Sequence, residues 1–221
     1  MLVALIGAAL PVQAQHANAH DANSTYPSMS PIAEYRMDRS AEIAMARTAA
    51  PASISRDAEI MVLGDKNFEV AVKGKNGFVC AVGRAFGGPL GNPEFWNPKN
   101  RSPICYNPPA VRSLWPYAVK QTGMALAGAS KAQITDAIKA AVGKKELGPP
   151  ESGCMAYMMS KEAYLTDRGG HNLAHLMFEL PRGGMFQDDP AYFVSWEPAP
   201  VIEFNVPVGK WSDGTPIAPP R

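Results

Sequence analysis

Three short runs rich in β-branched and aromatic residues constrain the fold of this chain most strongly. They cover residues 58–63, 68–73 and 78–84. Gly-Asp-Lys-Asn separates the first two runs and Gly-Lys-Asn-Gly separates the last two, and both connectors contain residues that tolerate the positive φ angles of tight turns. The pattern predicts three strands that form an antiparallel meander.

Helices are predicted before and after these strands in the sequence. Residues 38–50 are good helix formers, and Pro51 ends the segment. Residues 115–127 begin with Trp-Pro, which places proline in the first helical turn. Ser130 and Gln133 form a capping-box pattern that begins another helix, in which apolar residues recur every four positions.

Three further strands are expected in the C-terminal third of the chain, at residues 154–160, 174–180 and 200–207. Two groups of strands with the helices between them predict an α+β fold. We expect an antiparallel sheet of about six strands in two groups of three, with two central helices on one face and an N-terminal helix.

The N-terminal residues resemble an export signal. Residues 1–14 contain an apolar core of about ten residues followed by Val12-Gln13-Ala14, a small-x-small cleavage pattern. Such a core is too short to span a bilayer, so we expect no stable membrane insertion. We therefore expect a signal peptide at 1–14, a flexible leader at 15–37, and one domain at 38–221 that acts in the periplasm or is secreted.

Charge and motifs exclude several functional classes. The chain has 21 basic and 20 acidic residues and no extended run of one sign, so we expect no nucleic-acid partner. The phosphate-cradling and dinucleotide-binding glycine loops are absent, as are the Gly-x-Ser-x-Gly and His-Glu-x-x-His motifs. The expected partner is a small molecule or a metal ion.

The best candidate site lies between Gly169 and Leu180. In residues 175–180, three apolar side chains alternate with His175, Met177 and a glutamate, and we expect the apolar face to meet the core. If this run pairs with residues 154–160, imidazole and thioether groups converge. That mixture favours copper(I), or zinc if a carboxylate takes part. The candidate metal ligands are His175, His171, Met177 and Met159.

Two other interpretations of His175 remain open. It is a candidate general base, with Tyr157 or Ser160 as the acid or nucleophile. Glu179 lies roughly 13 Å along an extended strand from His175, which is too far to orient the imidazole ring directly. In the other interpretation, the methionines fill the core and His175 is a hydrogen-bonded residue at a sheet edge.

Aromatic residues in long connectors are candidates for ligand binding. Phe95, Trp96 and Tyr106 lie in a loop predicted at residues 85–109, and Trp196 lies in a later connector. They form either a platform for a flat ligand or a lid that packs on the core.

Of the three cysteines, Cys80 and Cys105 are the preferred disulfide pair, because the bond would close a loop of 25 residues that is rich in glycine and proline. Cys154 would then be unpaired. The alternative is three buried free thiols.

Four segments, in this order, resemble a family of uncharacterised exported bacterial proteins. They are residues 75–80, 102–106, 156–160 and 175–178. The similarity covers about residues 55–207. It implies export, one compact domain, and a shared framework that includes Cys80, Cys105 and His175. We therefore expect an exported protein that binds a small ligand or a soft metal around His175, with a secreted hydrolase as the alternative.

Overall fold

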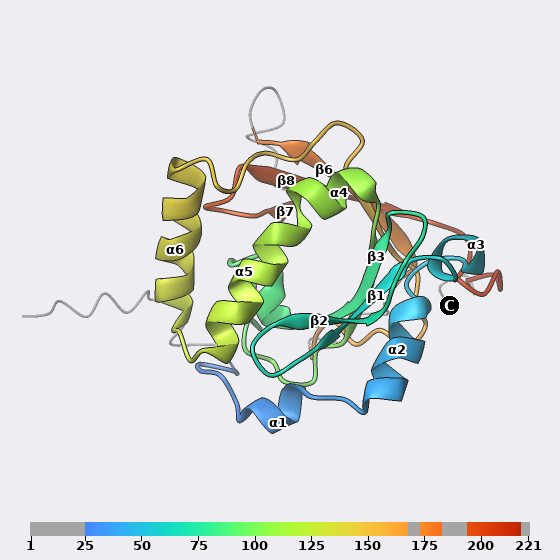
Figure 1. Ribbon diagram of the computed structural model, residues 1–221, viewed down its shortest axis with the longest axis horizontal. Helices are drawn as coiled ribbons and strands as arrows, with labels where there is room; N and C mark the ends of the chain where they lie inside the picture. Colours follow the sequence, from blue (N-terminus) through green and yellow to red (C-terminus); the bar gives the residue numbers. More distant parts are fainter. Residues whose placement is uncertain (1–24, 168–172, 183–193, 218–221) are drawn as a thin grey trace, which may run out of the picture.

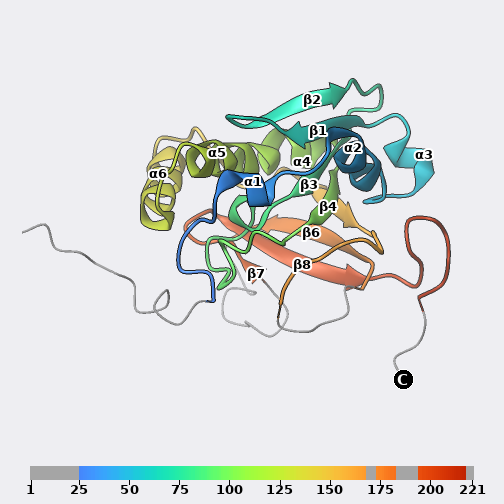
Figure 2. The same cartoon turned by 90° about the horizontal axis from the view of Figure 1, so that it is seen from below.

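The computed structural model describes residues 25–167, 173–182 and 194–217. Within these ranges the strands form one mixed sheet in the order β2-β1-β3-β4-β5-β6-β8-β7 (Figures 1 and 2). The strands are β1 (Glu59–Leu63), β2 (Phe68–Val72), β3 (Val79–Gly83), β4 (Ser102–Tyr106), β5 (Met155–Met158), β6 (His175–Pro181), β7 (Val194–Ser195) and β8 (Val201–Pro207). The helices are α1 (Ile32–Tyr35), α2 (Arg39–Arg47), α3 (Ala52–Ser55), η1 (Ala85–Gly87), α4 (Pro108–Ser113), α5 (Trp115–Leu126) and α6 (Lys131–Gly143).

Two of the three predicted helices begin at residues whose side chains cap them. The Asp38 side chain accepts a hydrogen bond from the Ala41 backbone N–H and begins α2. At α6, the Ser130 and Gln133 side chains satisfy each other's backbone N–H groups, which confirms the predicted capping box. The α+β class is therefore confirmed.

Helices cover both faces of the strongly curved sheet (Figures 1 and 2). Helix α2 packs on β1, β3 and β4, over a small core made largely of alanine, valine and the Cys80–Cys105 pair. Helices α4 and α5 lie over the opposite, concave face, where the larger core is found. The concave face and α5 enclose the cavity that is described below.

The predicted meander is wrong in one respect, because β3 does not pair with β2. Strands β1 and β2 form the expected antiparallel hairpin, but β3 lies on the other side of β1 and runs parallel to it. The connector after β2 crosses the end of β1, where the Lys75 N–H donates to the Asp57 carbonyl at 2.7 Å. A Cβ atom at Gly74 would lie 2.2 Å from the Glu59 nitrogen, so this crossing requires glycine.

The sheet also differs from the expected two groups of three strands. Residues 85–109, predicted as a loop, contain η1 and strand β4, which joins β3 to β5 and makes the sheet continuous. The short strand β7 extends the other edge beside β8. The described part of the chain therefore has eight strands rather than six.

The preferred disulfide is confirmed. Cys80 on β3 and Cys105 on β4 are direct cross-strand partners and are bonded to each other. Both are fully buried under α2. Cys154 is a buried free thiol.

Part of the segment expected as a leader packs against the domain. Tyr35 is fully buried, and its hydroxyl donates a hydrogen bond to the Trp96 carbonyl at 2.7 Å. The signal-like residues 1–14 lie outside the described residues. Among the described helices, none combines the length and apolar character needed to cross a bilayer.

Candidate functional site

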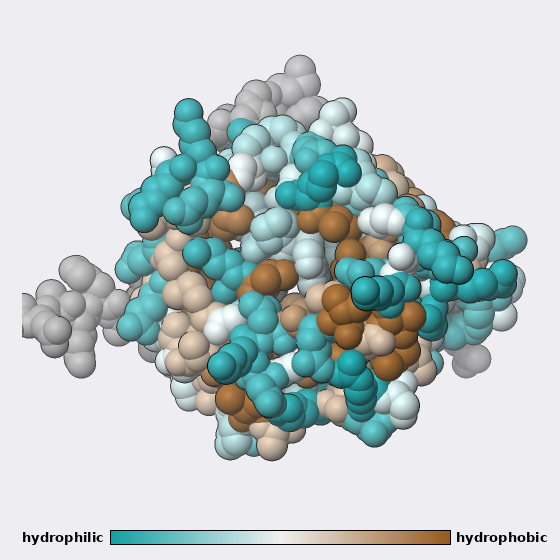
Figure 3. Space-filling view, viewed as in Figure 1, coloured by the Kyte–Doolittle hydropathy of each residue, from teal (hydrophilic) through white to brown (hydrophobic). Residues whose placement is uncertain are grey.

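A cavity of about 480 Å³ lies between the concave face of the sheet and helix α5. In the view of Figure 1 the surface is hollowed near its centre, between the α4–α5 pair and the β1–β2 hairpin (Figure 3). Strands β2, β4, β5, β6 and β8 and the segment around η1 all contribute to its wall. Its volume is in the range of pockets that bind small molecules.

Strand β6 turns His175 and Met177 toward this cavity and Glu179 inward on the same face, which reverses the expected orientation. Met177 and Glu179 are buried, whereas Leu180 on the other face is 42% exposed and Phe178 is half-buried. Because side chains alternate along a strand, His175 shares the inward face with Met177 and Glu179. The apolar face of β6 therefore does not form the core, and the versatile side chains do.

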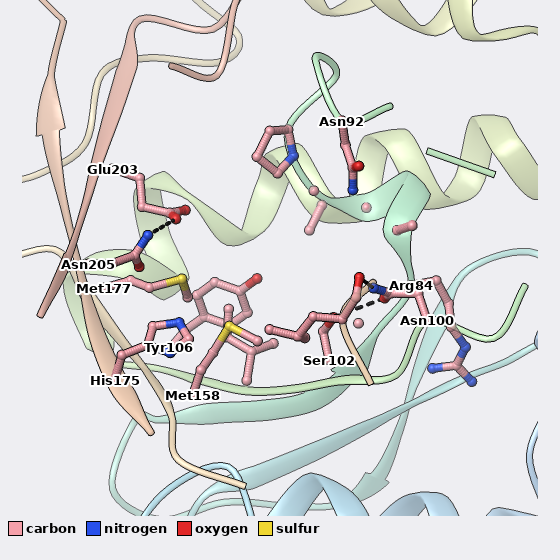
Figure 4. A pocket seen from close by; sticks show the side chains of 18 of the residues that line it. Arg84, Asn92, Asn100, Ser102, Tyr106, Met158, His175, Met177, Glu203 and Asn205 are labelled. Atoms are coloured by element: carbon pink, nitrogen blue, oxygen red, sulfur yellow. Dashed lines mark hydrogen bonds between the residues drawn. The ribbon is translucent and has the colours of Figure 1, made fainter. Parts of the chain in front are cut away.

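His175 lines the cavity at the start of β6 (Figure 4). Its Nδ1 lies 2.7 Å from the Leu173 carbonyl oxygen. Because a carbonyl only accepts hydrogen bonds, Nδ1 is the donor, and in the neutral ring Nε2 is left as an acceptor. His175 is thus a candidate hydrogen-bond acceptor or metal ligand.

Two glutamates form a buried pair next to the cavity. Glu179 on β6 and Glu203 on β8 are direct cross-strand partners, and they are 1% and 7% exposed. Burial and the nearby Glu203 raise the pKa of Glu179 to about 8. Burial also raises the pKa of Glu203, while hydrogen bonds from Asn205 and Trp196 and the interaction with His175 act in the opposite direction.

The two carboxyl groups have different partners. Glu203 lines the cavity and accepts hydrogen bonds from Trp196 Nε1 and Asn205 Nδ2, each at 3.0 Å (Figure 4). The Cys154 Sγ lies 3.5 Å from Glu179 Oε2. The other carboxyl oxygen, Glu179 Oε1, has no hydrogen-bond partner among the described residues. Glu203 is therefore the carboxyl group of the pair that faces the cavity.

The acidic pair affects the groups around it. Burial, and next the Glu179 carboxyl, raise the pKa of the Cys154 thiol to about 12. Burial raises the pKa of Tyr106 strongly, with further contributions from both glutamates. The cysteine and the tyrosine both remain neutral at neutral pH.

The structure separates the four aromatic candidates into two pairs. Tyr106 and Trp196 line the cavity, and Trp115 adds a third ring 5.3 Å from Tyr106. Phe95 and Trp96 pack against each other at 4.7 Å in the core and do not line the cavity. The platform interpretation fits the first pair, and the lid interpretation fits the second.

The candidate acids or nucleophiles do not lie beside His175. Tyr157 pairs with Leu176, so it is on the opposite face of the sheet, near the disulfide. The Ser160 hydroxyl is buried, lies 2.6 Å from the Thr48 hydroxyl, and accepts from the Glu162 N–H. Neither residue lines the cavity.

The proposed soft-metal ligands are only partly brought together. Met177 and His175 line the cavity, but Met158, rather than Met159, is the cross-strand partner of His175 and the methionine of β5 in the cavity wall (Figure 4). His171 lies outside the described residues. In the described part of the chain, no three His, Cys, Asp or Glu side chains gather closely enough to hold a metal ion.

Sequence reasoning missed Glu203 and Asn205, and it considered Glu179 as part of the His175 face and as a distant partner of His175, not as half of a buried acidic pair. A usable signal was present, because each of the strands β6 and β8 carries a glutamate in the middle of an apolar run. A charge at such a position needs a buried partner or a ligand.

The site's chemistry is thus an apolar cavity with a carboxyl, an amide and an imidazole group on one wall. No family model, curated protein or solved structure matches this chain.

Proposed function

We propose that this chain binds a small organic molecule with a largely apolar body in the cavity beneath α5. The observation that carries the proposal is the cavity of about 480 Å³, lined mainly by aromatic and aliphatic side chains and bearing polar groups on the β6–β8 wall. Such a combination fixes a ligand's orientation with a few polar contacts while its body is buried. We further propose that the protein acts outside the cytoplasm, which the signal-like N-terminus and the Cys80–Cys105 bond support.

A cavity-filling substitution tests this function. Ala118 on α5 is buried and lines the cavity, so Ala118→Leu places extra carbon atoms inside it. We expect ligands that raise the melting temperature of the natural protein to lose this effect in the variant. Ala140→Leu on the exposed face of α6 is the matched control. Equal binding by natural protein and Ala118→Leu would refute the proposal, provided that circular dichroism shows both to be folded.

Copper(I) binding is a second candidate, which one observation favours. The strand register places Met158 directly opposite His175, and Met177 is two residues from His175 on the same face. Two thioethers and an imidazole are ligands that copper(I) prefers. The described cavity wall therefore offers a soft donor set at one end.

Competition with a copper(I) chelator tests this second candidate. We expect Met158→Leu to weaken copper(I) binding at least about tenfold, and Met159→Leu, whose side chain lies away from the cavity, to leave it unchanged. Equal effects of the two substitutions would count against the site. No comparable observation favours the hydrolase, because Tyr157 and Ser160 lie away from His175.

A further inference from the structure

The carboxyl pair beside the cavity has no lysine or arginine partner in the part of the chain that the structure describes. Glu179 and Glu203 are side by side across the β6–β8 pair and are almost fully buried. Two carboxyl groups so placed cannot both ionise unless a cation balances them. Among the described residues, no lysine or arginine forms an ion pair with either one.

The arginine that lines the cavity pairs with a different carboxylate. Among the described lining residues, Arg84 is the one arginine or lysine. Its guanidinium is buried, donates to the Glu42 carboxylate at 3.0 Å, and donates to the Tyr35 carbonyl at 2.7 Å. His175 interacts with Glu203 without a hydrogen bond between them in the structure. The β6–β8 wall is therefore rich in hydrogen-bond acceptors and carries no lysine or arginine among the described lining residues.

Aromatic rings stand beside the cavity-facing carboxyl group. Trp196 donates its indole N–H to Glu203, and Tyr106 lines the same wall. Trp115 and Phe68, whose ring centroids are 4.8 Å apart, line the wall on the α5 and β2 sides. Aromatic faces attract cations, and the same rings bury apolar surface.

We propose, on the basis of the cavity function above, that the ligand is a protonated amine with an apolar body, bound with its ammonium group against the Glu203 carboxylate. Asn205 and Trp196 each donate to one oxygen of Glu203, which orients the carboxylate and leaves lone pairs for the ligand. The ammonium group supplies a positive charge that balances the pair. An alkyl amine is charged at neutral pH, so it enters the cavity in the form that this wall recognises.

Matched ligand series test the inference. One series is tryptamine, tryptophol and indolepropionate; the other is phenethylamine, phenethyl alcohol and phenylpropanoate. Within each series the body is constant, and the end group is an amine, an alcohol or a carboxylate. We expect calorimetry to show each amine binding about tenfold to a hundredfold more tightly than its alcohol, because a hydrogen bond to a charged group is stronger than a neutral one.

Variants of Glu203 then show whether this residue causes the preference for the amine. Glu203→Gln keeps the shape but loses the charge, and we expect it to reduce the amine preference to within about threefold. Glu203→Asp retains a carboxylate and should retain a preference for the amine. Glu146→Gln makes the same chemical change at an exposed site and serves as the control. Thermal unfolding shows whether each variant is folded.

The outcomes separate the inference from the proposed function. An alcohol or carboxylate that binds as tightly as its amine, an unchanged preference in Glu203→Gln, or no binding by both amines up to millimolar concentration overturns the amine inference. If the probes bind without preference and Ala118→Leu abolishes that binding, the cavity function stands alone. If Ala118→Leu leaves the binding unchanged, the cavity function fails as well.

Discussion

Glu179 makes folding stability depend on pH in a defined direction. Its side chain is 1% exposed, and burial, followed by Glu203, raises its pKa from 4.5 to about 8. The folded protein thus retains a proton that the unfolded chain releases above about pH 4.5. The corresponding stability is fully present below that pH and is lost as the pH rises through about 8. At about 1.4 kcal/mol per pKa unit, the loss amounts to about 5 kcal/mol.

Glu179→Gln removes this titration while keeping the size of the side chain. We expect the variant and the natural protein to have similar free energies of unfolding near pH 5, where Glu179 is protonated in the folded state. Near pH 9 the variant should be more stable by several kcal/mol, up to about 5. Urea denaturation at both pH values, followed by tryptophan fluorescence and circular dichroism, measures the difference.

The comparison isolates Glu179 because all other titrating groups are shared by the two proteins. Glu146→Gln, at an exposed position, should follow the natural protein across the whole pH range. Parallel stability profiles for the natural protein and Glu179→Gln would refute the reasoning, because they would show that Glu179 titrates alike in the folded and unfolded states.

Three further predictions concern other parts of the fold. Replacing Cys80 and Cys105 together by alanine should lower the free energy of unfolding by about 3 to 4 kcal/mol, because the bond closes a loop with a sequence separation of 25; urea denaturation checks this. Arg84→Met should destabilise by about 3 to 5 kcal/mol by leaving Glu42 buried and unpaired, and the double variant with Glu42→Leu should recover most of that loss in the same assay. The Cys154 thiol, with a pKa of about 12, should react with a thiol reagent at least about a hundredfold more slowly in native protein than in urea.

Features governed by near neighbours in the chain were predictable. The Asp38 cap and the Ser130–Gln133 capping box depend on residues within three positions of each other, so their outcome does not require knowledge of the fold. The β1–β2 hairpin depends in the same way on its four-residue connector.

Features governed by distant contacts were not predictable. The parallel pairing of β3 with β1 depends on how the Gly74 connector crosses the end of β1. The residues of the connector alone do not predict this crossing. Strand β4 contains Pro103 and follows a segment rich in proline and asparagine, so its sequence resembles a loop until β3 and β5 pair with it. The predicted alternation of side chains in β6 is correct. The predicted inward face is wrong, because the face that points inward depends on the cavity and on β8.

For the candidate site, the sequence indicated His175, Met177, Tyr106 and Trp196, and the structure places all four in the cavity wall. It did not indicate Glu203, because a charged residue is expected to face solvent unless a partner is known.

Strand β6 is frustrated in the sense used for folding landscapes, because its local pattern and its position in the sheet disagree. The pattern favours Leu176, Phe178 and Leu180 as the buried side, yet the sheet buries Met177 and Glu179 instead. A sequence selected for stability alone would exchange Glu179 for an apolar residue with little difficulty. The strand therefore marks a place where the demands of stability and of a polar inward face act in opposite directions, so variants chosen only for thermal tolerance should accumulate at Glu179.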